Sequence, residues 1–222
     1  MYTFKASPYS SHSLLLRALP SKGEGRTVLD VSCGNGYLAA LLAERGYVVT
    51  GIERKGGYQQ PFPSSVRLIE ADLESGLPAL SEGFHYVICA DILEHLRCPD
   101  TLLVELRNAV LPGGKLIASL PNSGNIYFRL NILAGRFPQD DKGLFDRTHV
   151  RFFMWNGWAT LLRDCGWTVD KTESSSIPIG LVVPPDWEHS RSVLLAERVC
   201  YGLAKIRKTL FAYQFVVTAH AG

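Results

Sequence analysis

The sequence has few of the features that would place the protein in a membrane, outside the cell or on nucleic acid. No stretch approaches the roughly 18 to 20 continuous apolar residues of a spanning helix, so we expect no membrane-spanning segment. The N-terminal stretch lacks a charged region followed by a long apolar core, and no signal peptide is predicted. The net charge of only +2 gives no electrostatic footprint for nucleic acid.

Cysteine is also scarce and is not arranged in pairs. The five cysteines are scattered and none belongs to a CxxC pair, so neither a disulfide framework nor a metal site is predicted. Reduced thiols are typical of the cytosol, and we therefore expect a cytoplasmic protein. From the low net charge we expect no nucleic-acid partner.

What is present is the pattern of an α/β domain. Apolar, β-branched runs alternate with stretches of helical period over the 222 residues. Strands are predicted at 27–32, 48–53, 66–73, 85–92, 115–122, 167–174 and 213–220, and helices at 37–46, 99–110, 155–167 and 192–210. Pro112-Gly113-Gly114 predicts a turn. This alternation predicts a Rossmann-like three-layer α/β sandwich with a mostly parallel sheet.

A glycine-rich turn follows the first predicted strand, in the segment from Asp30 to Gly36. Such a turn lets a ligand approach the backbone closely, and the helix after it presents unpaired N–H groups to an anionic group. Glu53 follows at about the distance where a ribose-binding acid belongs in dinucleotide-binding folds. The turn alone leaves open a nicotinamide dinucleotide, another nucleotide cofactor, or glycines that serve only tight packing.

Further motifs appear in a fixed order along the chain. VLDVSCGNGYLA is followed by GIE, EADLE, ICADILEHLRCPDTLL and LPGGKLIASLPN. This set, from Val28 to Phe153, resembles the class I S-adenosylmethionine-dependent methyltransferases, and closely those of the MetW and ubiquinone-biosynthesis type. The last strand resembles the same family. The resemblance implies a seven-stranded sheet whose last strand is antiparallel, and S-adenosylmethionine as the cofactor.

The resemblance also implies the cofactor site. Asp30, Ser32, Gly34 and Gly36 form the turn under the methionine part, Glu53 holds the ribose hydroxyls, Asp72 and Leu73 contact the adenine, and Ala90 and Asp91 belong to the same site. Asp91 has the alternative role of capping the loop after its strand. Ser32 departs from the family, which usually has glycine there, and its Cβ comes closer to the ligand.

The catalytic candidates follow from the chemistry of methyl transfer to a hydroxyl group, which must lose a proton. Histidine suits that task because its unperturbed pKa lies near working pH. His149, in LFDRTHVRFF, is the candidate base or acceptor-orienting residue, with Asp146 near it. His95, after the fourth strand, is a second candidate. His149 has the alternative role of docking its loop, and His95 that of anchoring the next helix.

We therefore expect one methyltransferase domain over residues 1–222, with substrate-covering insertions near 123–150 and 177–210. The predicted reaction is O-methylation of a small-molecule acceptor such as a glycan, a lipid or quinone precursor, or a secondary metabolite. The alternatives are an NAD-dependent oxidoreductase and a non-catalytic S-adenosylmethionine-binding protein. The predicted helix at 192–210 combines apolar and basic residues, which leaves peripheral membrane contact open.

Overall fold

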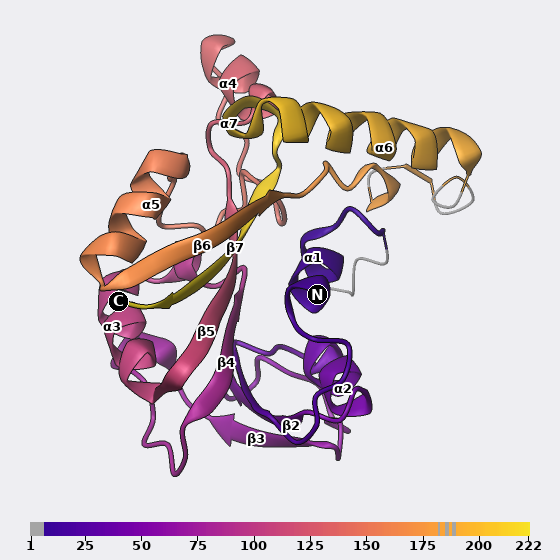
Figure 1. Cartoon of the computed structure of the whole chain (residues 1–222). Coiled ribbons are helices and arrows are strands. Elements are labelled where there is room, and N and C mark those ends of the chain that lie inside the picture. Colours follow the sequence, from indigo (N-terminus) through magenta and orange to yellow (C-terminus); the bar gives the residue numbers. More distant parts are fainter. Residues whose placement is uncertain (1–6, 182, 185–186, 188–189) are drawn as a thin grey trace.

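One seven-stranded sheet forms the centre of the computed structural model, which describes residues 7–181, 183–184, 187 and 190–222 (Figure 1). The strands are β1 (Thr27–Val31), β2 (Val48–Glu53), β3 (Val66–Glu70), β4 (Phe84–Ala90), β5 (Val110–Pro121), β6 (Trp167–Ser174) and β7 (Gln214–Ala221). Their order is β3-β2-β1-β4-β5-β7-β6. The pairs among β1 to β5 are parallel, whereas β7 runs antiparallel to both its neighbours. The predicted fold class is confirmed.

Helices cover both faces of the sheet, as Figure 1 shows. α1 (Ser11–Ala18) and α2 (Tyr37–Glu44) lie on one face, and α3 (Pro99–Ala109) and α5 (Trp155–Asp164) on the other. Successive side chains of a strand point to opposite faces. On β4, Ile88 accordingly packs in the cluster of α1 and α2, while Val87 and Cys89 pack in the cluster of α3 and α5. The sheet thus divides the hydrophobic core into two halves.

The segment after β5 differs from its expected irregular course. It contains a helix, α4 (Ile126–Leu133), which begins at Asn125, whose side chain accepts a hydrogen bond from the Tyr127 N–H at 2.9 Å. Phe128 is the one residue of α4 that is buried. A helix that faces solvent on most sides has no amphipathic period, so the sequence pattern gave no sign of it.

The predicted helix at 192–210 is two helices, α6 (Arg191–Ile206) and α7 (Lys208–Phe211). They are separated at Arg207, whose φ of −133° and ψ of 79° are not helical. Across the part of the chain that the structure places, no helix is both long and apolar enough to cross a bilayer.

Two strand boundaries also differ from prediction. Pro112-Gly113-Gly114 is part of β5 rather than a turn before it: Phe84 pairs with Val110 and Tyr86 with Lys115, so the extra residues bulge from the ladder. The strand predicted at 66–73 ends at Glu70, and a 3₁₀ turn follows at Leu73–Ser75. This early end brings the residues after β3 to the edge of the sheet where the site lies.

Candidate functional site

A cavity of about 660 Å³ lies at the carboxyl ends of β1, β2 and β4, where open α/β sheets bind ligands. Eight of the nine residues predicted to bind the cofactor line it: Asp30, Ser32, Gly34, Glu53, Asp72, Leu73, Ala90 and Asp91. The ninth, Gly36, is not among its lining residues. Two of the three catalytic candidates, His95 and Asp146, also line the cavity, and His149 does not.

The two glycines of the turn after β1 serve different purposes. Gly34 has a φ of +53°, and a Cβ built on it would meet no heavy atom within 4 Å. It therefore leaves open space at the cavity wall. Gly36, with a φ of +73°, is the N-cap of α2, and a Cβ there would lie 2.8 Å from the ring of Phe62. Gly36 is thus needed for backbone conformation and packing behind the cavity.

Ser32 adopts the left-handed conformation that usually requires glycine, with a φ of +63°. This explains why the family has glycine at that position, since a Cβ makes this region less favourable. The Ser32 hydroxyl donates a hydrogen bond to Glu53 Oε2 at 3.2 Å. This bond offsets part of the backbone strain, so the turn keeps its shape with serine in it.

Glu53 ends β2 and is only 7% exposed. Its Oε2 accepts a hydrogen bond from the Gly34 N–H at 2.9 Å, and its Oε1 accepts one from the Arg54 N–H at 2.9 Å. Both oxygens are therefore held by backbone groups at the cavity wall. A carboxylate fixed in this way retains acceptor capacity for a pair of hydroxyl groups, because each oxygen offers two lone pairs.

Asp30 lies at the floor of the cavity and is almost completely buried. Its Oδ2 has no hydrogen-bond partner among the described residues. Burial, and secondarily the nearby charge of Glu53, raise the pKa of this carboxyl from 3.8 to about 7. A buried acceptor without a partner beside a cavity fits a cationic or hydrogen-donating group of a bound ligand.

The opposite end of the cavity is formed after β3. Asp72 is the N-cap of the turn at Leu73–Ser75, and its Oδ1 accepts a hydrogen bond from the Glu74 N–H at 3.0 Å. The side chain of Leu73 is beside it in the cavity wall. An apolar side chain next to a carboxylate suits a flat base that carries an amino group. This is the arrangement that the adenine of the predicted cofactor requires.

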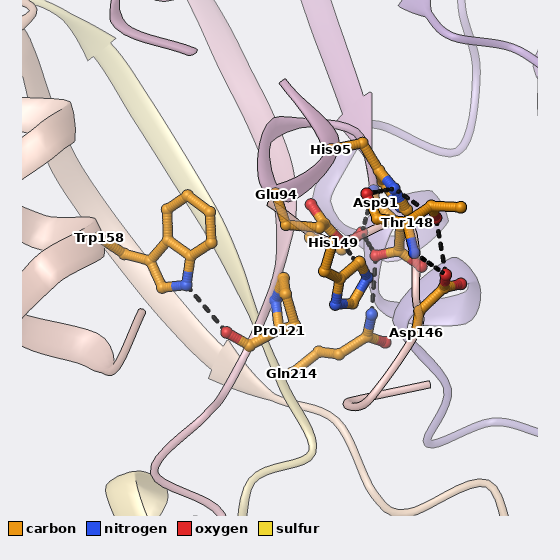
Figure 2. Close-up of polar contacts among 10 residues, drawn as sticks. Asp91, Glu94, His95, Pro121, Asp146, Thr148, His149, Trp158 and Gln214 are labelled. Atoms are coloured by element: carbon orange, nitrogen blue, oxygen red, sulfur yellow. Dashed lines mark hydrogen bonds and ion pairs between the residues drawn. The ribbon is translucent and has the colours of Figure 1, made fainter. Parts of the chain in front are cut away.

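Asp91 follows β4 and is held in an unusual conformation, with a φ of +53°. Its Oδ1 accepts hydrogen bonds from the hydroxyl of Ser119 and from Gln214 Nε2, the latter at 2.7 Å (Figure 2). Its own N–H donates to Ser119 Oγ at 3.0 Å. Ser119 on β5 and Gln214 on β7 were not predicted. Nothing in the sequence reveals them, because the sheet brings them together across more than 90 residues.

A chain of hydrogen bonds fixes the tautomer of His95. Thr148 Oγ1 donates to Asp146 Oδ1 at 2.6 Å, and His95 Nδ1 lies 3.0 Å from Thr148 Oγ1 and 3.3 Å from the Thr148 carbonyl oxygen (Figure 2). Because the hydroxyl proton is already donated and a carbonyl only accepts, Nδ1 of His95 must be the donor. The neutral ring then carries no proton on Nε2.

His149 lies behind His95 rather than in the cavity wall. Its side chain is 5% exposed, and its ring packs edge-on against that of His95 with the centroids 4.7 Å apart. Burial, and then the proximity of His95, lower the pKa of His149 from 6.5 to about 4. The imidazole is therefore neutral at physiological pH. Its Nε2 is 3.8 Å from Glu94 Oε1 (Figure 2).

The same side chains form a possible metal site. Glu94, His95 and His149 each offer one donor atom, and these atoms lie within 4.8 Å of one another. One carboxylate and two imidazoles form a donor set that suits a divalent transition metal. The expectation of a site without a metal ion therefore stays a prediction.

His12 and Arg147 also line the cavity. His12 lies in α1, whose N-cap Ser10 accepts a hydrogen bond from the Ser13 N–H at 3.2 Å. The start of α1 therefore closes one side of the cavity. Arg147 forms an ion pair with Asp141, another lining residue, so the charge of this guanidinium is already paired within the protein.

A sheet in this order, with β7 inserted antiparallel between β5 and β6 and a buried acid, a glycine turn and a second acid around the cavity, defines a class I methyltransferase fold. The chain belongs to the methyltransferase domain family, whose model matches residues 7–172. The predicted class is therefore confirmed, with S-adenosylmethionine as the cofactor of that class. The alternative of an NAD-dependent oxidoreductase gains no support.

Curated relatives and solved structures agree with this family. The ubiquinone biosynthesis O-methyltransferase of Pseudomonas entomophila is 29% identical to this chain over 120 residues, which cover 51% of this chain and 52% of the relative. That of Pseudomonas syringae pv. tomato is 32% identical over 105 residues, which cover 44% of this chain and 45% of the relative. The chain thus matches only about half the length of these relatives.

Two solved structures share the fold at low sequence identity. One is a methyltransferase from Archaeoglobus fulgidus, with a TM-score of 0.63 and 20% identity, covering 94% of this chain and 91% of that one. The other is 1,6-didemethyltoxoflavin-N1-methyltransferase from Burkholderia thailandensis, solved with bound 1,6-didemethyltoxoflavin and S-adenosylhomocysteine. Its TM-score is 0.59 and its identity 18%, covering 98% of this chain and 79% of that one.

Proposed function

We propose that this protein transfers the methyl group of S-adenosylmethionine to a hydroxyl group of a small-molecule acceptor. The observation that carries the proposal is the position of His95, whose protonated Nδ1 is directed to Thr148, in the wall of a cavity that also contains the predicted cofactor residues. The O-methyltransferase activity named for the curated relatives supports a hydroxyl acceptor. A glycan, a quinone or lipid precursor and a secondary metabolite are all compatible with this chemistry.

The residues around the cavity fit S-adenosylmethionine. Glu53 would hold the ribose hydroxyls, Asp72 and Leu73 the adenine, and Asp30 the methionine end, where its buried oxygen without a partner accepts a hydrogen bond or faces a cation. When bound, the sulfonium supplies an activated methyl group. The protein then mainly aligns the acceptor and excludes water.

We assign the role of base to His95 rather than to His149. His95 lines the cavity and its Nε2 carries no proton, so it can accept the proton of an acceptor hydroxyl. Asp146 acts through Thr148, whose hydroxyl it orients, and stabilises the imidazolium that forms. His149 packs against the ring of His95 and acts as a positioning residue.

The first predicted insertion supplies Asp141, Asp146, Arg147 and Thr148 to the cavity wall, and the second lies elsewhere in the sequence, before β7. α4 and the segment up to Thr148 follow β5, and α6 and α7 precede β7. We propose that both cover the acceptor within a single domain. We also propose a cytoplasmic location, which agrees with five cysteines that are all free.

The test compares two histidine variants in a methyl-transfer assay with a catechol as the probe acceptor. His95→Gln should lower kcat by about 100-fold or more, the range expected for loss of a general base, without changing the affinity for S-adenosylhomocysteine. His149→Gln should lower kcat less. His220→Gln is the matched control, because His220 lies at the other end of β7 and pairs with Asp170.

Two results would contradict the assignment. If His95→Gln keeps a rate near wild type while His149→Gln does not, the base is His149 as the sequence suggested. If S-adenosylhomocysteine binds but no hydroxyl acceptor is methylated by the wild type, while an amine acceptor is, then the proposed O-methylation is wrong.

A further inference from the structure

Helix α6 carries an exposed apolar surface that faces away from the rest of the protein. The outer face of α6 consists of Leu195, Val199, Leu203 and Ile206, and these side chains are between 39% and 79% exposed. Their spacing of four, four and three residues places them on one side of the helix. Exposed apolar side chains that are scattered singly need no explanation, but a continuous row indicates a surface that binds something.

The opposite side of α6 is fixed to the protein, so the helix cannot roll to bury this row. Val193, Glu197 and Ala204 are buried there. Glu197 Oε2 accepts a hydrogen bond from Ser7 Oγ at 2.6 Å, and its Oε1 accepts one from the Gly180 N–H at 3.2 Å. The helix is thereby held in one orientation with its outer face toward the solvent.

A basic row runs beside the outer face. Arg191, Arg198 and Lys205 are spaced seven residues apart, which aligns them along the helix, and all three are exposed. Glu197 is the single acidic residue in 190–222, and it is buried. The exposed surface of α6 is therefore apolar on one flank and purely cationic on the next, although the whole chain has a net charge of only +2.

A second exposed apolar helix stands at the same end of the molecule. In Figure 1, α4 lies next to α7, from which α6 extends. The side-chain amides of Asn122 and Asn125 donate to the Ala212 carbonyl at 2.8 and 2.9 Å, which fastens the base of α4 to the end of α7. Leu130 and Leu133 of α4 are 56% and 81% exposed.

From these features we propose that α6 lies flat on an anionic lipid bilayer, with its outer face in the interface and its basic row against the headgroups, and that α4 contacts the same surface. An apolar face flanked by lysine and arginine is the pattern of interfacial helices. A second copy of this chain fits less well, because pairing through α6 would bring two basic rows together. This interaction goes beyond methyl transfer, and its test needs neither acceptor nor turnover.

The test measures flotation of the whole protein with lipid vesicles. Vesicles of phosphatidylcholine containing phosphatidylglycerol should bind it, vesicles of phosphatidylcholine alone should bind it much less, and added salt should weaken binding. Leu195→Ser combined with Ile206→Ser should reduce binding by about tenfold or more. Arg198→Gln combined with Lys205→Gln should reduce it by about fivefold for each charge removed.

Val104→Ser on α3 and Arg163→Gln on α5 are the matched controls, because both residues are exposed and neither lies on α6. They should bind the charged vesicles as the wild type does. Circular dichroism of each variant confirms the fold. Absence of vesicle binding, or equal binding by the α6 variants and the controls, would overturn the proposal. So would a dimer in solution that Leu195→Ser dissociates, since the outer face would then be an interface between copies.

Discussion

Asp30 offers a sharp test of the site through the pH dependence of stability. Its pKa is raised from 3.8 to about 7 in the folded protein, so the folded state holds a proton that the unfolded chain releases between these values. This contribution to stability is fully present below pH 3.8 and is lost as the pH rises through 7. Above pH 7, ionised Asp30 should cost about 4 kcal/mol relative to its protonated form.

Asp30→Asn replaces the titrating carboxyl group by an amide that does not titrate, while keeping the shape of the side chain. Without ligand, the stability of the variant relative to the wild type should rise by about 3 kcal/mol from about pH 4.5 to about pH 8, in urea unfolding at both pH values. Its affinity for S-adenosylhomocysteine should fall, because the variant lacks the carboxylate that we propose faces the methionine end. Asp164→Asn, at an exposed site on α5, is the control and should show no pH-dependent gain.

The reasoning fails if the difference in unfolding free energy between Asp30→Asn and wild type is the same at both pH values. That result would mean that Asp30 titrates as an ordinary carboxyl group in the folded protein. A variant that is more stable at high pH but binds S-adenosylhomocysteine as well as the wild type would keep the pKa and remove Asp30 from the cofactor site.

Substitutions at three further positions test the backbone and the core. Ser32→Gly should relieve the strain of the left-handed backbone and keep or raise the melting temperature. Ser32→Ala keeps this strain and loses the hydrogen bond of the hydroxyl, so it should lower the melting temperature. The reverse order would contradict the strain argument. Gly36→Ala should cost about 1–3 kcal/mol in urea unfolding, since its Cβ would meet the Phe62 ring and its φ of +73° disfavours a side chain. An unchanged midpoint would contradict both the steric and the backbone argument. Trp158→Phe should cost about 1–3 kcal/mol, because the buried indole N–H donates to the Pro121 carbonyl at 2.8 Å (Figure 2). Thermal unfolding measures this cost, and an unchanged stability would argue against that bond.

Local patterns predicted the parts of the fold that depend on neighbours in the sequence. The strand β1, the glycine turn after it and the helix α2 are adjacent in the sequence, so period and turn chemistry were sufficient to identify them. Glu53 ends β2 and Asp72 lies two residues after the end of β3, and the parallel order of the sheet brings them to one edge. The part of the cavity that we propose holds the cofactor could therefore be predicted from the sequence.

The part of the cavity that we propose holds the acceptor could not be predicted, because it depends on contacts between distant elements. Asp91 is held by Ser119 and Gln214, and His95 by Thr148, each from a different segment of the chain. A period can predict that β7 is a strand, but not which of its residues meets a carboxylate across the sheet. The relative depth of His95 and His149 likewise follows from packing alone.

The position of β7 has a consequence for the order in which the protein is made. This strand comes after β5 and β6 in the sequence but lies between them, pairing with residues 110–121 and 167–174. While the ribosome synthesises the chain, the inner edges of both strands stay unpaired until residues 214–221 have emerged. Such long-range pairing is slow, and the nascent chain should depend on chaperones that shield these edges until the sheet closes.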